Sequence, residues 1–137
     1  MPTALAVTDT HSLLWWGDSG KHRKLGRRAR AHFQRADQEQ AAIYVPTLVI
    51  AEISELVHIG RVELALPFGA WLDALERSTS YLIADLTADV VRRANDLFAI
   101  TERGDRLIAA TARSLDVPIM TRDENISSTA GIEWLWD

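Results

Sequence analysis

The stretch Gly104–Ile126, GDRLIAATARSLDVPIMTRDENI, constrains the fold more than any other part of the chain. Its apolar, alanine-rich first half predicts a helix over roughly Arg106–Leu115, and a tight connection then leads into a short apolar strand, Val117–Thr121. Asp105 opens the helix, and Asp123 follows the strand. In an open parallel α/β sheet, ligands bind at the rim formed by the carboxyl ends of the strands. Two acids at that rim suggest a divalent metal held by oxygen ligands.

The rest of the chain repeats this alternation of short apolar runs and amphipathic segments. Further strands are predicted over Ala4–Thr8, Ala42–Val45 and Tyr81–Leu86. The run GIEWLW predicts an edge strand with Ile132, Trp134 and Trp136 on one side. Helices are predicted between the strands, among them Lys24–Ala36, a helix that Pro46 begins and Gly60 ends, and Ala88–Ile100. Strands that alternate with helices favour a parallel sheet with helices on both faces.

Composition excludes several classes of protein. A chain of 137 residues suits one domain with a single core. It has no Cys, which excludes disulfides and thiolate catalysis. No apolar run approaches the length of a membrane span. The N-terminal MPTALAVTDTH lacks the basic start of a signal peptide, so we expect a cytoplasmic protein without a membrane partner.

Two more acids stand at positions where a charge needs an explanation. Asp9 directly follows the first predicted strand, where it can act as a helix N-cap or as a metal ligand, and both readings stay open. Glu52 is spaced by four from Leu48 and from Leu56, so it shares a helix stripe with apolar residues and faces the domain. A carboxylate there is costly unless it is paired or bound to metal; the alternative is a surface acid whose charge reaches water.

The joint placement of Asp9, Glu52, Asp105 and Asp123 is the functional signal. Carboxylate oxygens suit Mg²⁺ or Mn²⁺, and such a site can serve in-line displacement at a phosphodiester. The four His show no zinc-like spacing, and the chain has no glycine-rich phosphate loop. We therefore expect these four acids to form one metal-dependent catalytic site.

One basic segment stands out on a chain whose formal net charge is −4. Seven of the 15 Lys and Arg residues lie between Lys21 and Arg35, and no acid occurs from Ser19 to Ala36. A helical wheel places the apolar residues on one face and four arginines on the other: Arg27, Arg28, Arg30 and Arg35. This face is either a solvated charged surface or a ridge that contacts RNA phosphates beside the active site.

Four segments together resemble a known family. They are DTHSLLWW (residues 9–16), AEISELVHIGRVEL (51–64), DRLIAATARSLDVPIMTRDENI (105–126) and GIEWLW (131–136). These segments are similar to the PIN domain and, more narrowly, to the VapC-like toxin ribonucleases of type II toxin–antitoxin modules. The resemblance covers nearly the whole chain, and the first and third segments together are its specific part.

The resemblance implies a complete functional picture. The fold would be a three-layer α/β/α sandwich with a central, mostly parallel sheet of four or five strands, and residues 1–137 would form a single PIN domain. The activity would be that of a Mg²⁺-dependent endoribonuclease, with Mn²⁺ as a possible substitute, acting on tRNA or ribosomal RNA. The family's acids match Asp9, Glu52, Asp105 and Asp123. A cognate antitoxin and a homodimer would be the partners.

The chain departs from the family pattern at one place. Members usually carry DPADRLIAATA, whereas this chain has Glu102-Arg103-Gly104-Asp105, which keeps an acid but loses the proline. Two other functions compete with the ribonuclease. A non-catalytic PIN-like module would bind nucleic acid through a partner protein. A phospho-acceptor domain would need a lysine after a late strand, but the two lysines are Lys21 and Lys24.

Overall fold

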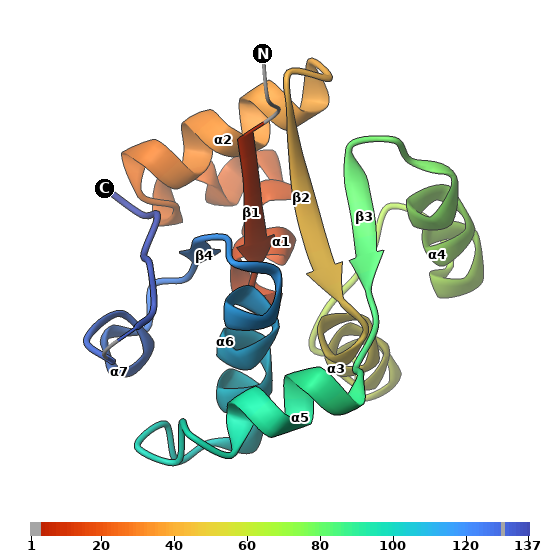
Figure 1. Cartoon of the computed structure of the whole chain (residues 1–137). Coiled ribbons are helices and arrows are strands. Elements are labelled where there is room, and N and C mark those ends of the chain that lie inside the picture. Colours follow the sequence, from red (N-terminus) through yellow and green to blue (C-terminus); the bar gives the residue numbers. More distant parts are fainter. Residues whose placement is uncertain (1–3, 130) are drawn as a thin grey trace.

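The computed structural model describes residues 4–129 and 131–137, and a four-stranded parallel sheet forms its centre (Figure 1). The strand order is β3-β2-β1-β4. The strands are β1 (Ala4–Thr8), β2 (Ala41–Pro46), β3 (Tyr81–Ala84) and β4 (Ile119–Met120). The predicted mostly parallel sheet is therefore confirmed, with four strands.

The register of the sheet decides which residues meet at its rim. In the pairing of β1 with β4, Val7 lies opposite Ile119 and Thr8 lies opposite Met120. Both strands then end, so Asp9 and Thr121 leave the sheet side by side. This adjacency brings together residues from the two ends of the sequence.

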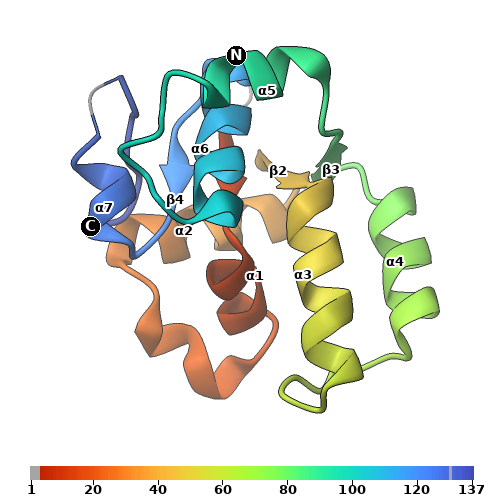
Figure 2. The same cartoon turned by 90° about the horizontal axis from the view of Figure 1, so that it is seen from below.

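Helices cover both faces of the sheet, as Figure 2 shows from below. The helical elements are α1 (Thr10–Trp16), the 3-10 helix η1 (Ser19–Lys24), α2 (Arg27–Asp37), α3 (Thr47–His58), α4 (Phe68–Arg77), α5 (Ala88–Ala94), α6 (Arg103–Leu115) and α7 (Glu124–Ser127). α5 and α6 lie on one face, and α1, α2 and α3 lie on the other. The result is the predicted three-layer α/β/α arrangement. None of the helices in the described ranges is long and apolar enough to cross a membrane.

The helix α6 lies against β1 through a face of small residues. Ala109, Ala110 and Ala112 are buried beside Ile108, so the backbone of the helix comes close to the sheet. α6 ends at Asp116, which adopts a left-handed conformation with φ 55°. The short turn that follows delivers the chain directly into β4.

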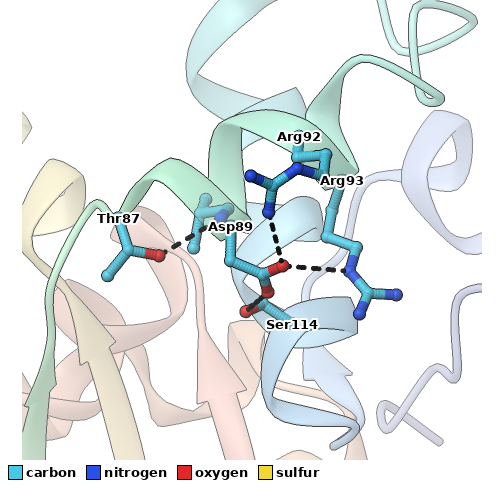
Figure 3. Close-up of polar contacts among 6 residues, drawn as sticks. Thr87, Asp89, Arg92, Arg93 and Ser114 are labelled. Atoms are coloured by element: carbon cyan, nitrogen blue, oxygen red, sulfur yellow. Dashed lines mark hydrogen bonds and ion pairs between the residues drawn. The ribbon is translucent and has the colours of Figure 1, made fainter.

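Polar contacts fasten α5 to the end of α6 (Figure 3). Asp89 accepts a hydrogen bond of 2.6 Å from the Ser114 hydroxyl and forms ion pairs with Arg92 at 3.3 Å and Arg93 at 3.7 Å. Thr87 caps α5 by accepting from the backbone N–H of Val90 at 3.2 Å. This cluster supports the far end of the helix whose first turn carries Asp105.

The predicted helix over Lys24–Ala36 was wrong at its start. η1 ends at Lys24, Leu25 is extended, and α2 begins only at Arg27. The break lies at Gly26, where a Cβ would overlap the backbone of Trp136. The Trp136 carbonyl instead accepts from the N–H groups of Arg28 at 2.9 Å and Ala29 at 3.0 Å. The Arg27 N–H also donates to Asp137 Oδ1 at 3.0 Å across 110 residues of sequence, so the C-terminal segment decides where this helix begins.

The predicted edge strand over residues 131–136 was also wrong. Among the residues that the structure describes, this segment forms one bridge, between Ile119 and Trp134. Ile132, Trp134 and Trp136 were also expected to share one side of this strand. They do not, because Trp134 is 38% exposed whereas Trp136 is 6% exposed. The segment turns away from the sheet because Trp136 caps α2, so pairing stops after one bridge.

Three predicted elements are shorter than expected, and one predicted boundary is confirmed. The strand predicted over Tyr81–Leu86 ends at Ala84. The helix predicted over Ala88–Ile100 ends at Ala94, where Asn95 and Asp96 begin a series of turns; such residues favour turns over helix interiors. The strand predicted over Val117–Thr121 narrows to the two residues of β4. Gly60 follows α3 with φ 75°, which confirms it as the residue that ends this helix.

Candidate active site

Asp9 lies at the carboxyl end of β1 and both of its oxygens are engaged. Oδ1 accepts from the backbone N–H of Ser12 at 2.9 Å, which makes Asp9 the N-cap of α1. Oδ2 accepts from the Thr121 hydroxyl at 2.6 Å. The N-cap reading of Asp9 is therefore correct, and the second oxygen still points toward the end of β4.

Asp123 is held next to Asp9 through the same threonine. The hydroxyl of Thr121, which is wholly buried, accepts from the backbone N–H of Asp123 at 3.1 Å. Asp123 Oδ1 in turn caps α7 by accepting from the Asn125 N–H at 2.8 Å. Thr121 thus connects two of the predicted site acids.

Asp105 stands in the first turn of α6 and faces Asp9 and Asp123. Burial raises the pKa of Asp105 to about 7; hydrogen bonding with Asp123 adds to the shift, as do the negative charges of Glu102, Asp123 and Asp9. Burial is the largest cause of this shift, and the contributions of Asp123, Glu102 and Asp9 arise because these carboxylates lie near Asp105. The structure therefore brings together the three aspartates that the sequence predicted.

Glu52 approaches the same place from α3 and is half-buried. Its Oε1 accepts from the Thr10 hydroxyl at 3.0 Å. Burial raises the pKa of Glu52, the Thr10 hydrogen bond opposes that rise, and the charge of Glu102 adds to it. Glu52 lies near Gly104, since a Cβ on that glycine would be 3.4 Å from Glu52 Oε1.

Three residues that support the acids were not in the predicted site: Thr10, Thr121 and Glu102. Burial opposes ionisation of Glu102, but backbone hydrogen bonds from Asp105 and Gly104 outweigh it, so the pKa of Glu102 is lowered. Thr10 and Thr121 each lie one or two residues from a predicted acid. Their closeness to these acids in sequence could have pointed to them, but a threonine near an acid is common and does not by itself indicate a functional contact.

The donor chemistry of the site fits a hard divalent cation. Carboxylates that raise one another's pKa are stabilised when a cation takes the place of the shared proton. Within residues 4–129 and 131–137, however, the side chains of no three His, Asp or Glu residues are placed close enough to hold a metal ion together. Their oxygens are instead engaged by Ser12, Thr121, Asn125 and Thr10. The acids are assembled, therefore, in hydrogen-bonded rather than coordinating positions.

The predicted basic face lies at the other end of the strands. Figure 1 shows α2 beside the amino-terminal part of β1 and β2, whereas α6 and α3 lie toward the arrowheads. Arg27, Arg28 and Arg35 are exposed, and Arg30 is half-buried. The predicted contact with RNA thus stays a prediction, and it requires an RNA that reaches around the sheet.

A groove of about 1340 Å³ begins at His11, next to the acids, and runs past α1 toward α4. Aromatic residues line it, including Trp15, Trp71 and Tyr81. Its charged lining residues are of both signs: Lys21, Arg61, Asp18, Asp37 and Glu63. Because these charges nearly balance, the groove is not an electrostatic track for phosphates.

Comparison with known proteins decides the family. The profile of the PIN domain matches residues 6–132. This chain belongs to the PIN domain family. The match spans β1 to the segment after α7, so it includes all four predicted acids. None of the curated proteins matches the chain significantly.

Several solved structures share the fold of this PIN domain at low sequence identity. VapBC2 from Rickettsia felis, bound to a promoter DNA fragment, is 15% identical with a TM-score of 0.68 and covers 97% of this chain and 99% of its own. VapC20 from Mycobacterium tuberculosis, a toxin that cleaves the sarcin–ricin loop, is 16% identical with a TM-score of 0.63. The match covers 98% of this chain and 100% of VapC20. A toxin–antitoxin complex from Klebsiella pneumoniae is 17% identical with a TM-score of 0.59. The match covers 93% of this chain and 94% of the matched chain.

Proposed function

We propose that this PIN domain is a metal-dependent endoribonuclease that hydrolyses phosphodiester bonds in RNA. Asp9, Glu52, Asp105 and Asp123 are its catalytic and metal-binding residues, and Mg²⁺ is the cofactor, with Mn²⁺ as a substitute. The observation that carries the proposal is the closeness of the acids at the end of β1 and β4: burial raises the pKa of Asp105 to about 7, and hydrogen bonding with Asp123 and the negative charges of Glu102, Asp123 and Asp9 add to that rise. Unpaired acids that repel one another are unfavourable in a metal-free protein, and a divalent cation relieves the repulsion.

The chain's own residues perform three tasks in this proposal. Thr121 orients Asp9 and Asp123, and Thr10 orients Glu52. Asp105 holds a proton near neutral pH and releases it when positive charge arrives. When bound, the cation supplies Lewis-acid charge that offsets the negative charge developing on the phosphodiester. The four carboxylates would hold the cation.

We further propose that this nuclease is the toxin of a type II toxin–antitoxin module in the cytoplasm. Support comes from three solved structures that share its fold: VapBC2, a toxin–antitoxin complex, and a toxin that cleaves the sarcin–ricin loop. The substrate would be tRNA or ribosomal RNA, the inhibitor a cognate antitoxin protein, and the active form a homodimer. Exposed apolar side chains, such as Phe98 at 61%, are compatible with such an interface.

The test is an assay of purified protein on structured RNA with and without divalent metal. Cleavage that needs Mg²⁺ or Mn²⁺ and disappears in Asp105→Asn supports the nuclease. RNA binding without cleavage at any metal concentration supports the non-catalytic module instead. Co-expression with the product of an adjacent small reading frame tests the toxin assignment, because a cognate antitoxin should co-purify and abolish cleavage.

A further inference from the structure

The first turn of α6 holds an unusual cap. Both oxygens of Glu102 accept from backbone N–H groups, Oε1 from Gly104 at 3.0 Å and Oε2 from Asp105 at 2.6 Å. Aspartate is the usual capping acid, and glutamate is one methylene longer. Glu102 therefore has to fold back over the helix to reach these donors, and its carboxylate comes to lie over residue 104.

Gly104 leaves the space that this folded-back carboxylate needs. A Cβ at this position would lie 3.1 Å and 3.2 Å from the two Glu102 oxygens and 3.4 Å from Glu52 Oε1. The first two distances fall below ordinary van der Waals contact, which begins at 3.4 Å. Gly104 is buried, so these carboxylate oxygens would have to shift to make room for an added methyl group.

Backbone conformation gives no other reason for this glycine. Gly104 lies inside α6 and does not have positive φ. Glycine is among the least favourable residues in a helix, and alanine is the most favourable. A glycine here is therefore explained by its contacts rather than by the backbone.

We propose that Glu102 and Gly104 are a matched pair of positioning residues for Asp105. The folded-back acid at 102 fits best when residue 104 has no Cβ, because a Cβ there would push both Glu102 oxygens away from their N–H donors. Together the two residues hold the Asp105 N–H, and so its carboxylate, toward Asp9 and Asp123. Glu102 acts through the backbone, because its two oxygens accept from the N–H groups of Gly104 and Asp105 in the first turn of α6. The kinetic part of this inference rests on the proposed nuclease activity, whereas the part that is measured by thermal melting does not.

A double-mutant cycle tests the pair through thermal melting of the metal-free protein. Gly104→Ala in the wild-type background should lower the Tm by about 3–6 °C because the methyl group presses on both carboxylates. In the Glu102→Asp background the same change should leave the Tm unchanged or raise it, because the shorter acid vacates the space and alanine favours the helix. A Gly104→Ala effect of equal size and sign in both backgrounds would overturn the pairing.

Cleavage kinetics and metal titration complete the test. Gly104→Ala should reduce kcat at least about tenfold with little change in KM, and adding Glu102→Asp should restore most of it. Glu102→Gln, which keeps one acceptor oxygen, should retain the rise in Tm that Mg²⁺ or Mn²⁺ produces. Loss of that rise would show that Glu102 binds the metal and would overturn its role as a positioning residue.

The two proposals fail in different ways. If the wild-type protein cleaves no RNA, the nuclease assignment fails, and the melting cycle still decides whether Glu102 and Gly104 are matched. If the wild type cleaves RNA but the cycle shows no coupling, the matched pair alone is overturned. Far-UV circular dichroism of every variant separates these effects from loss of the fold.

Discussion

The Thr121 hydroxyl donates a hydrogen bond of 2.6 Å to Asp9 across 112 residues of sequence. The same oxygen accepts from the backbone of Asp123 at 3.1 Å, and the side chain of Thr121 is fully buried. One hydroxyl therefore sets the relative position of two acids that leave neighbouring strands.

Replacing this hydroxyl should impair the site without dismantling the fold. Thr121→Val keeps the shape of the side chain but leaves Asp9 without its partner, and we expect a loss of about 10- to 100-fold in metal affinity or activity. Thr121→Ser should recover most of that loss because it restores the donor. Steady-state kinetics over a range of Mg²⁺ concentrations measures both variants. Equal activity of the Val variant and the wild type would show that Asp9 needs no such support.

Asp105 should make the metal-free protein less stable as pH rises. Its pKa is raised from 3.8 to about 7 in the folded state, so between these values the unfolded chain releases a proton that the folded chain keeps. Stability should therefore decrease from about pH 4 to pH 7 and level off above pH 7. Glu52, whose pKa is also raised, contributes with the same sign.

Melting of Asp105→Asn in EDTA checks this expectation. At pH 8 the variant should melt above the wild type because it lacks the unfavourable charge, and near pH 4 the two should melt at similar temperatures. The wild type's affinity for Mg²⁺ should increase as pH rises toward 7, since the cation displaces the Asp105 proton. A wild-type Tm that is independent of pH over this range would contradict the assembled acid cluster.

Much of the fold was predictable because its signals are local. Apolar runs such as Ala4–Thr8 and Ala42–Val45 predict buried strands, and their alternation with helices indicates a parallel sheet. In such a sheet the residue after a strand must lie at the rim, so Asp9 and Asp123 were expected near each other. The raised pKa of Asp105 agrees with that expectation.

The features that sequence missed depend on long-range register. Thr121 meets Asp9 only because Thr8 pairs with Met120, and Thr10 meets Glu52 only because α1 packs against α3. The start of α2 depends on Trp136, which also ends the expected edge strand early. None of these contacts leaves a periodic pattern in the local sequence, so no local reading could have found them.

The exposed arginines at the start of α2 yield a prediction about long substrates. If Arg27 and Arg28 contact RNA phosphates, replacing both by Ala should raise KM and change kcat less. The salt slope, meaning the steepness with which the logarithm of the binding constant falls with the logarithm of the salt concentration, should decrease by about 0.7 per lost contact. Because α2 lies away from the acids, the effect should disappear for short oligonucleotides. Arg77→Ala, an exposed arginine on α4, serves as the control. Unchanged KM and salt slope on long RNA would leave α2 as a solvated face or an antitoxin contact.

The most direct test of the whole account is the metal dependence of RNA cleavage by the wild type and by Asp9→Asn. We expect the wild type to cleave structured RNA in Mg²⁺ or Mn²⁺, to stop in EDTA, and to recover when the metal is returned. Asp9→Asn should cleave nothing while keeping the wild-type circular dichroism spectrum, because the amide still accepts from Ser12 but carries no charge for the metal. Cleavage that persists in EDTA, or that survives in Asp9→Asn at the wild-type rate, would contradict a catalytic site built on these acids.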